Sequence, residues 1–279
     1  MKRIQALFLA AVFLFSLASC SQKDGEEVKM EAGGVRLVSR VSAEKGSYYD
    51  VEGAVKKTDA AAFSAALRRD TEKAYRSDPT PADGRARGTV EESFATYPDA
   101  EGYLGFTVFN PLETMEGLTK TDPDGAAEEE EGAPRYIRVS ATGNGSAVEE
   151  ASLTAAYLTQ SGVPLTLRFE WNAKGETVSC RVNDDGKVFY TAELLSATNG
   201  AKALLITNAG KEETTGTAAA AAPETETAAE ETARLFRAEA YFVKNGIFCT
   251  ISASGEETRA AEIRRALMLA VNAFGEPEA

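Results

Sequence analysis

Hydrophobic and polar residues alternate along much of this chain, which is the pattern of strands that bury one face. The clearest stretch covers residues 163–171, where every second residue is large and apolar and where Thr166, Arg168 and Glu170 form the opposite, polar face. Similar alternation predicts further strands over residues 35–41, 48–55, 103–109, 136–141, 178–182, 187–194, 203–207, 235–243 and 247–252. Strands with one apolar and one polar face are typical of antiparallel sheets.

Turn residues between these runs predict how neighbouring strands connect. The sequences NAKG (172–175) and NDDG (183–186) separate three alternating runs, so we expect residues 163–194 to form a three-stranded meander. Asn245-Gly246 lies between two more runs, and this dipeptide favours a tight hairpin turn because both residues tolerate a positive φ. The runs on either side of it are therefore expected to form a β-hairpin.

Two segments upstream of this hairpin have the features of helices instead. An alanine-rich segment over residues 59–76 begins at Asp59, a residue type that caps helices. Farther along, Ser146 and Glu149 have the spacing of a capping box, and Gly162 is placed to end a helix that starts there. Both segments are therefore expected to be helical.

The last segment of the chain has the strongest helical pattern. Ser254 and Glu257 again have capping-box spacing, and Gly275 is placed to end the helix. The large apolar residues of this segment form one stripe: Ile263, Leu267, Ala270, Val271 and Phe274. Such a stripe normally faces the core, so we expect this helix to lie on the sheet.

Together these elements predict an α+β fold, in which an antiparallel sheet of about seven to ten strands is covered by two or three helices. We expect a single domain over residues 34–275. Residues 116–134 and 211–232 are rich in small and acidic residues and poor in large apolar ones. Such segments cannot bury enough apolar surface to offset the entropy of ordering, and they are expected to be flexible acidic loops of that domain.

The composition limits the partners that the protein can have. Hydrophobic residues make up 43% of the chain, which is enough to fill a core. The chain has 30 basic and 43 acidic residues, which gives a net charge of −13. Because this charge repels phosphate backbones, we predict that the protein binds no nucleic acid.

Histidine is absent from the sequence, which removes the commonest general base and the commonest metal ligand. We therefore predict no catalytic residue, no metal site and no cofactor. A pair of carboxylates or a Ser–Lys pair is the alternative that remains, and either would make the protein a hydrolase.

Two of the three cysteines lie in predicted strands. Cys180 and Cys249 occupy the apolar faces of the runs over 178–182 and 247–252. Three interpretations stay open for them. Both are buried free thiols that act as small apolar side chains, or they form a disulfide bond with each other, which an exported protein can retain. The third is a redox or nucleophilic role, although neither site has the helix N-terminus or the pattern of basic neighbours that would lower a thiol pKa.

The amino-terminal residues form a separate pattern that points to export. Two basic residues precede an apolar run over 6–17, which is too short to span a membrane as a helix. The tetrapeptide Leu17-Ala18-Ser19-Cys20 follows at once. This stretch resembles the signal peptide and lipobox of bacterial lipoproteins, whereas the rest of the chain resembles no known family.

The resemblance implies that residues 1–19 are removed as a signal peptide and that Cys20 then carries acyl chains such as palmitate. Two or more acyl chains anchor a protein stably, so the lipid bilayer is the first expected partner. The polar residues 20–33 would form a lipidated tether. In this family an Asp after the cysteine retains the protein in the inner membrane; Ser21 stands there instead and implies the outer membrane.

The sequence thus predicts a membrane-anchored envelope lipoprotein that is not an enzyme and that acts as a binding or interaction module. The expected architecture is similar in outline to that of the Lol carriers, which hold an acyl chain between a curved sheet and helices. An apolar ligand in that space and another envelope protein are therefore the expected partners besides the bilayer. The alternatives are a surface antigen or structural spacer without a small-molecule site, and the hydrolase.

Overall fold

The computed structural model describes residues 25–42, 46–77, 88–123, 135–145, 147–183, 190–209 and 235–275. The helices in these residues are α2 (Ala65–Ser77), α3 (Tyr97–Leu104) and α4 (Ala260–Ala273). The strands are β1 (Gly25–Ala32), β2 (Val35–Ser42), β3 (Gly46–Ala54), β4 (Gly88–Phe94), β5 (Leu118–Thr121), β6 (Ile137–Asn144), β7 (Ala147–Thr159), β8 (Pro164–Asn172), β9 (Thr177–Asn183), β10 (Tyr190–Ser196), β11 (Lys202–Ala209), β12 (Leu235–Lys244) and β13 (Ile247–Glu256).

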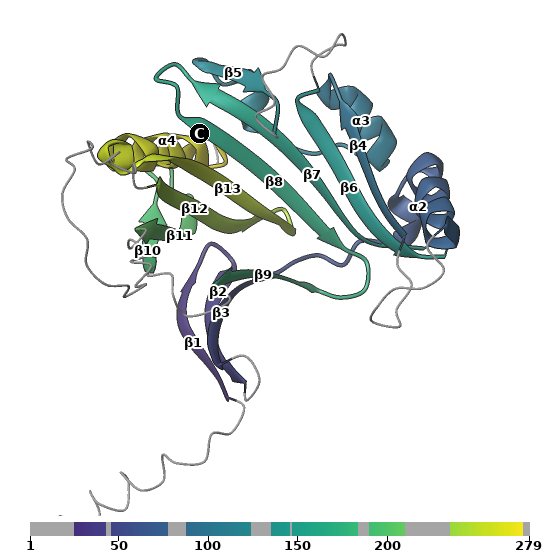
Figure 1. The fold of residues 1–279 in the computed structure, drawn as a ribbon, viewed down its shortest axis with the longest axis horizontal. Coiled ribbons are helices and arrows are strands. Elements are labelled where there is room, and N and C mark those ends of the chain that lie inside the picture. Colours follow the sequence, from purple (N-terminus) through teal and green to yellow (C-terminus); the bar gives the residue numbers. More distant parts are fainter. Residues whose placement is uncertain are drawn as a thin grey trace, which may run out of the picture.

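The strands of the described residues form two antiparallel sheets (Figure 1). The larger sheet has nine strands in the order β10-β11-β12-β13-β8-β7-β6-β4, with β5 paired to β7 outside this order. The smaller sheet has the order β1-β2-β3-β9. Antiparallel sheet with a few helices agrees with the α+β class that the sequence predicts. The prediction of a single sheet of seven to ten strands is corrected to thirteen strands in two sheets.

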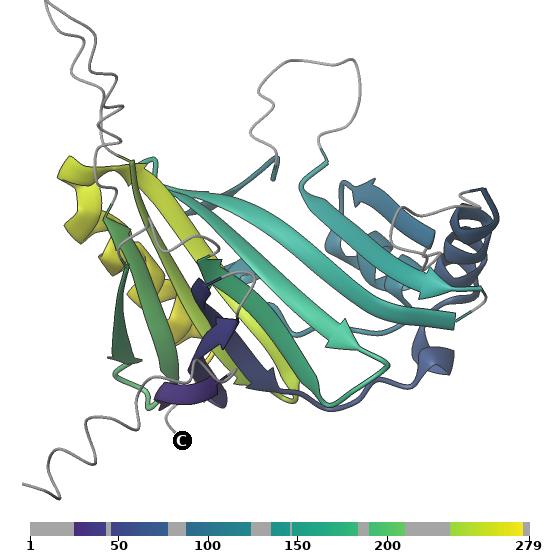
Figure 2. The same ribbon diagram turned by 60° about the horizontal axis from the view of Figure 1, so that its bottom comes forward.

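The larger sheet lies between the helices and the smaller sheet. Successive residues of β11 alternate between two cores: Ala203 and Leu205 belong to the core under the helices, whereas Leu204 and Ile206 belong to a second core under the smaller sheet. Figure 2 shows the purple strands of the smaller sheet in front of the larger sheet and the yellow α4 behind it. We call the face of the larger sheet that is turned away from the helices the open face.

The predicted C-terminal helix is α4, and its apolar stripe faces the core as expected. All five residues of the stripe are buried, with Leu267 fully so. The predicted start is wrong, because Ser254 stays in β13 and the helix begins at Ala260 after a short 3-10 turn. The ladder between β12 and β13 continues to Glu256, and it occupies the backbone groups that a cap at Ser254 would have served.

The largest error of the sequence prediction concerns residues 146–162, which contain the strand β7 and not a helix. β7 pairs with β6 on one side and with β8 on the other. Leu153, Ala155 and Tyr157 belong to the core under the helices and follow each other with the strand period of two. Local helix propensity is a weak preference, and the two ladders of hydrogen bonds on either side of β7 override it.

Two other predicted elements also differ from the structure. No strand forms over residues 103–109, because α3 ends at Leu104 and Gly105 adopts the left-handed φ of 112° that closes a helix. The predicted meander is wrong as well: β8 pairs with β7 and β13, β9 pairs with β3, and β10 pairs with β11. The chain changes sheets after β8, so the turn at 172–175 joins two sheets instead of two neighbouring strands.

The predicted hairpin at Asn245-Gly246 is confirmed. Both residues have a positive φ, 55° and 80°, and the ladder of β12 with β13 starts beside them.

The predicted helix over 59–76 forms in part, since Asp59 caps a 3-10 turn and α2 begins only at Ala65.

The smaller sheet is fixed to the open face at one end. The Gly33 carbonyl, in the turn between β1 and β2, accepts a hydrogen bond of 2.7 Å from the Val243 backbone amide of β12. Gly53 of β3 lies so close to the Phe248 ring that a Cβ there would be 2.3 Å from it. The Gly25 end of β1 points away from the larger sheet (Figure 1). The smaller sheet therefore projects from the open face.

Part of the predicted tether and part of one predicted loop form strands. β1 lies within residues 20–33, and β5 lies within residues 116–134. The other predicted loop, over 211–232, lies outside the described residues, as do the predicted signal peptide and Cys20.

In the described part of the chain, no helix has both the length and the apolar character that crossing a membrane requires.

Candidate functional site

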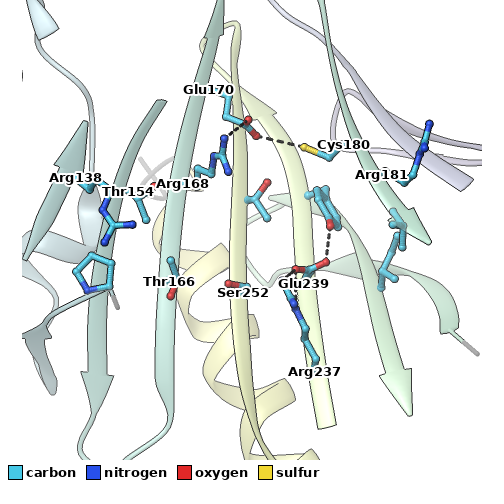
Figure 3. Close-up of a pocket in the computed structure, with 15 residues that line it drawn as sticks. Arg138, Thr154, Thr166, Arg168, Glu170, Cys180, Arg181, Arg237, Glu239 and Ser252 are labelled. Atoms are coloured by element: carbon cyan, nitrogen blue, oxygen red, sulfur yellow. Dashed lines mark hydrogen bonds and ion pairs between the residues drawn. The ribbon is translucent and has the colours of Figure 1, made fainter. Parts of the chain in front are cut away.

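The open face of the larger sheet is hollowed into a cleft of about 500 Å³. The cleft is lined by side chains from β8, β12 and β13 of the larger sheet, and β9 of the smaller sheet bounds it on one side (Figure 3). A second hollow of about 350 Å³ shares Arg168 and Glu170 with it and extends over β6 and β7. Together they form a polar groove across the sheet.

β8 supplies the polar face that the alternation over residues 163–171 predicts. Arg168 Nη2 lies 3.0 Å from one carboxylate oxygen of Glu170. The Cys180 thiol of β9 donates to the other oxygen, with 3.4 Å between Sγ and oxygen. Figure 3 shows these three side chains meeting at one end of the cleft. Glu170 therefore links the two sheets through Cys180 and orients Arg168.

β12 repeats this arrangement on the other side of β13. Arg237 donates from Nε and Nη2 to one oxygen of Glu239, at 3.0 and 2.6 Å. The Tyr241 hydroxyl donates to the other oxygen of Glu239 at 2.5 Å. An Arg-x-Glu pair thus lies on the open face of both strands that flank β13, and in each pair the carboxylate holds the guanidinium.

β13 lies between these pairs and contributes hydroxyl groups. Thr250 pairs in register with Arg168 on one side and with Tyr241 on the other, and Ser252 pairs with Glu239. Among the described residues, Thr250 Oγ1 is buried and has no hydrogen-bond partner. A buried hydroxyl without a partner costs free energy, and Thr250 carries this cost at the floor of the cleft.

The two cysteine thiols in the described residues are not activated as nucleophiles. Burial and the neighbouring Glu170 raise the pKa of the Cys180 thiol well above its ordinary value. Burial raises the pKa of the Cys249 thiol to about 12. Both thiols are therefore protonated at neutral pH, whereas thiol chemistry needs the thiolate.

The predicted alternative of a disulfide between Cys180 and Cys249 is not formed, and both thiols are free. The two cysteine side chains lie in different hydrophobic cores, on opposite faces of the larger sheet. Cys249 belongs to the core under the helices, whereas Cys180 packs against the core under the smaller sheet. Of the site residues predicted from the sequence, Cys180 alone lines the cleft.

Comparison with known proteins adds no relative. No family model matches the chain, and neither a curated protein nor a solved structure shows significant similarity to it. The site must therefore be read from its own residues and their geometry.

Four charged residues of the cleft were missed from the sequence: Arg168, Glu170, Arg237 and Glu239. Their signal is the repeated Arg-x-Glu pattern on the polar faces of two predicted strands. The pattern alone does not show that the two strands flank the same neighbour.

Within the described ranges, no group of three or more His, Cys, Asp or Glu side chains is placed to hold a metal ion.

A second charged cluster covers the outer face of the smaller sheet. Glu52 accepts hydrogen bonds from Arg36 and Arg40, and Asp50 accepts from Arg40 and Arg181, at 3.1 and 3.3 Å. The Glu52 side chain is only 7% exposed. Burial by itself would raise its pKa, but the hydrogen bonds from Arg40 and Arg36 outweigh burial and lower the pKa of this carboxyl group. The cluster therefore stabilises the smaller sheet with Glu52 ionised.

Replacing Glu52 with glutamine is expected to lower the free energy of unfolding by about 1–3 kcal/mol near neutral pH. Because the folded-state pKa of Glu52 lies below its ordinary value of about 4.3, the stabilisation is complete above that pH. It is lost as the pH falls through the folded-state pKa. The difference between wild type and Glu52→Gln should therefore shrink below about pH 4.

Urea denaturation at several pH values measures this difference. The matched control is Glu27→Gln, whose side chain is 70% exposed and pairs with Lys29; it should change the free energy of unfolding by less than about 0.5 kcal/mol. A difference for Glu52→Gln that grows towards low pH would contradict the stabilising role of the ionised carboxylate.

Proposed function

We propose that this chain is a lipid-anchored protein of the bacterial cell envelope that binds a ligand in the open-face cleft and catalyses no reaction. The observation that carries the proposal is the position of the cleft relative to Cys20. β1 begins at Gly25, close behind Cys20 in the sequence. The smaller sheet, which contains β1, projects from the same face of the larger sheet that carries the cleft.

Chain length limits how far the cleft can lie from an anchor at Cys20. The segment from Cys20 to Gly25 spans at most about 18 Å when fully extended. The strand β1 adds roughly 25 Å at the usual rise per residue. An anchor on Cys20 would therefore keep the far end of β1, beside the larger sheet, within about 43 Å of the bilayer.

The groups in the cleft support binding over hydrolysis. The carboxylates of Glu170 and Glu239 hold neighbouring arginines, and the Cys180 thiol stays protonated. The volume of the cleft favours a ligand-binding module over a spacer.

The polar lining of the cleft also changes the kind of ligand that is expected. The apolar space predicted between sheet and helices is occupied by core side chains such as Phe169 and Leu267, so we propose a polar ligand on the opposite face.

Replacing Cys20 with serine is expected to move the protein from the membrane fraction to the soluble fraction. The reason is that acyl chains on the Cys20 sulfur would supply the attachment. Ser21 supports the outer membrane as the site of attachment. Fractionation of cells, together with labelling by radioactive palmitate, measures the change.

Cys180→Ser is the matched control, because it removes a thiol from the same chain without touching the anchor. This variant should remain in the membrane fraction and incorporate palmitate as the wild type does. If Cys20→Ser still sediments with membranes and still incorporates palmitate, the proposed anchoring is refuted.

A further inference from the structure

The arginine side chains of the two Arg-x-Glu pairs are exposed to solvent, whereas their glutamate side chains are largely buried. The side chains of Arg168 and Arg237 are 51% and 59% exposed, whereas those of Glu170 and Glu239 are 15% and 17% exposed. A guanidinium carries five N–H donors in a planar fork, and the partner glutamate occupies only one edge of it. The exposed part of each pair is therefore a set of hydrogen-bond donors with positive charge.

Both oxygens of each carboxylate already accept hydrogen bonds or an ion pair within the protein. One oxygen of Glu170 accepts from Arg168 and the other accepts from the Cys180 thiol. In the second pair, one oxygen of Glu239 accepts from Arg237 and the other accepts from the Tyr241 hydroxyl. These contacts leave the carboxylates to position the arginines rather than to receive a donor from outside.

Hydroxyl groups lie between and beside the arginines. Thr250, which pairs in register with Arg168, has the buried Oγ1 without a partner, and Ser252 and Thr166 follow along the same face. Hydroxyl groups both donate and accept, so they suit a ligand that carries hydroxyl or ether oxygens next to its charge. Arg138 lines the far side of the cleft, where it pairs with Glu91 at 3.2 Å, and Arg181 of β9 lines it as well, so four guanidinium groups of the described residues line the cleft.

We propose that the cleft binds a polar ligand through an oxyanion, a phosphate or a carboxylate, that contacts the guanidinium of Arg168 or of Arg237. The inference rests on the proposed binding function and specifies its ligand class. Arginine forks match the geometry of these anions and bind them by charge-assisted hydrogen bonds. The chain has a net charge of −13, whereas the described residues that line the cleft include four arginines and two glutamates, and a local positive potential can attract an anion there.

Calorimetric titration of the full chain in micelles of a neutral detergent tests the proposal. The probes are inorganic phosphate, glycerol phosphate and citrate, each titrated to about 10 mM, where a site of millimolar affinity is largely filled. We expect saturable binding of at least one probe. Arg168→Gln or Arg237→Gln should weaken it about tenfold, because one of the two removes a charge-assisted contact with the anion; unchanged affinity in both variants would overturn the proposal.

The variant Glu239→Gln separates an anion site from a cation site. It removes a negative charge beside Arg237 and keeps an oxygen that Tyr241 can use. The proposal predicts tighter binding of the anionic probes by this variant. Weaker binding of the anionic probes by this variant would overturn the proposal.

Arg76→Gln is the control for nonspecific loss of positive charge. Arg76 lies on α2, pairs with Glu72 and is 74% exposed; its replacement should leave the affinity for the anionic probes unchanged.

The thermal midpoint of each variant shows whether it is folded. If Arg168→Gln does not fold, Arg168→Lys replaces it, and the loss of the fork should still weaken binding. Absence of binding for all three probes, or an equal loss with Arg76→Gln, overturns the proposal.

A second arm distinguishes a free ligand from one carried by the membrane. Vesicles of phosphatidylglycerol and of phosphatidylcholine are mixed with the anchored protein, and glycerol phosphate is added as competitor. Competition by glycerol phosphate for phosphatidylglycerol supports a headgroup ligand, whereas binding of the soluble probes alone supports a free anion. These results are independent of Cys20→Ser fractionation, so a failure of anchoring and a failure of anion binding are seen separately.

Discussion

Replacing Phe248 with alanine is expected to lower the free energy of unfolding by about 3–5 kcal/mol. Phe248 is fully buried, and it is the residue of β13 on which the smaller sheet packs. Its ring lies 6.1 Å from the Tyr241 ring and against the backbone of Gly53. Truncation would leave a cavity between two sheets that neighbouring side chains cannot close, because Gly53 has none.

Urea denaturation of the full chain measures this loss. Phe109→Ala is the matched control, since Phe109 is 54% exposed and meets Phe274 only at the edge of its ring. It should cost less than about 1.5 kcal/mol. Equal costs for the two variants would show that the smaller sheet does not depend on Phe248.

Leu267→Ala is expected to cost about 2–5 kcal/mol, the usual range for a buried leucine. Leu267 is fully buried in the middle of the α4 stripe, where it belongs to the core under the helices. Leu269 lies two positions farther along the same helix and is 48% exposed. The two residues have the same helix propensity, so their difference isolates burial.

Leu269→Ala should cost less than about 1 kcal/mol in the same denaturation experiment. The competing interpretation is that the apolar stripe of α4 binds a membrane or a partner. In that case Leu267→Ala would leave the unfolding midpoint unchanged and would weaken association instead.

The sequence was sufficient to predict elements whose pattern is local. The alternation over 163–171 gives β8 and its polar face, and Asn245-Gly246 gives the hairpin of β12 and β13. Both depend on period and on turn chemistry, which are properties of neighbouring residues. The pattern of 146–162 wrongly predicted a helix for the same reason, since local propensity does not include the three strands that pair with β7.

The second sheet and the cleft depend on contacts that no local pattern specifies. β9 follows β8 in the chain but pairs with β3, more than a hundred residues earlier. The cleft arises because Arg168 and Arg237 lie on strands that both pair with β13. Sequence spacing between the two arginines does not contain that information, so the residues were seen as polar strand faces and not as a site.

The most direct test of the lipid-anchored binding module is the mass of the amino-terminal peptide of the protein purified from its own membrane. The account predicts a mature chain that begins at Cys20 and carries a diacylglycerol with further acyl mass on that residue, and it predicts that this species is absent from Cys20→Ser. A peptide that retains residues 1–19, or one that begins at Cys20 without acyl mass, would contradict the account.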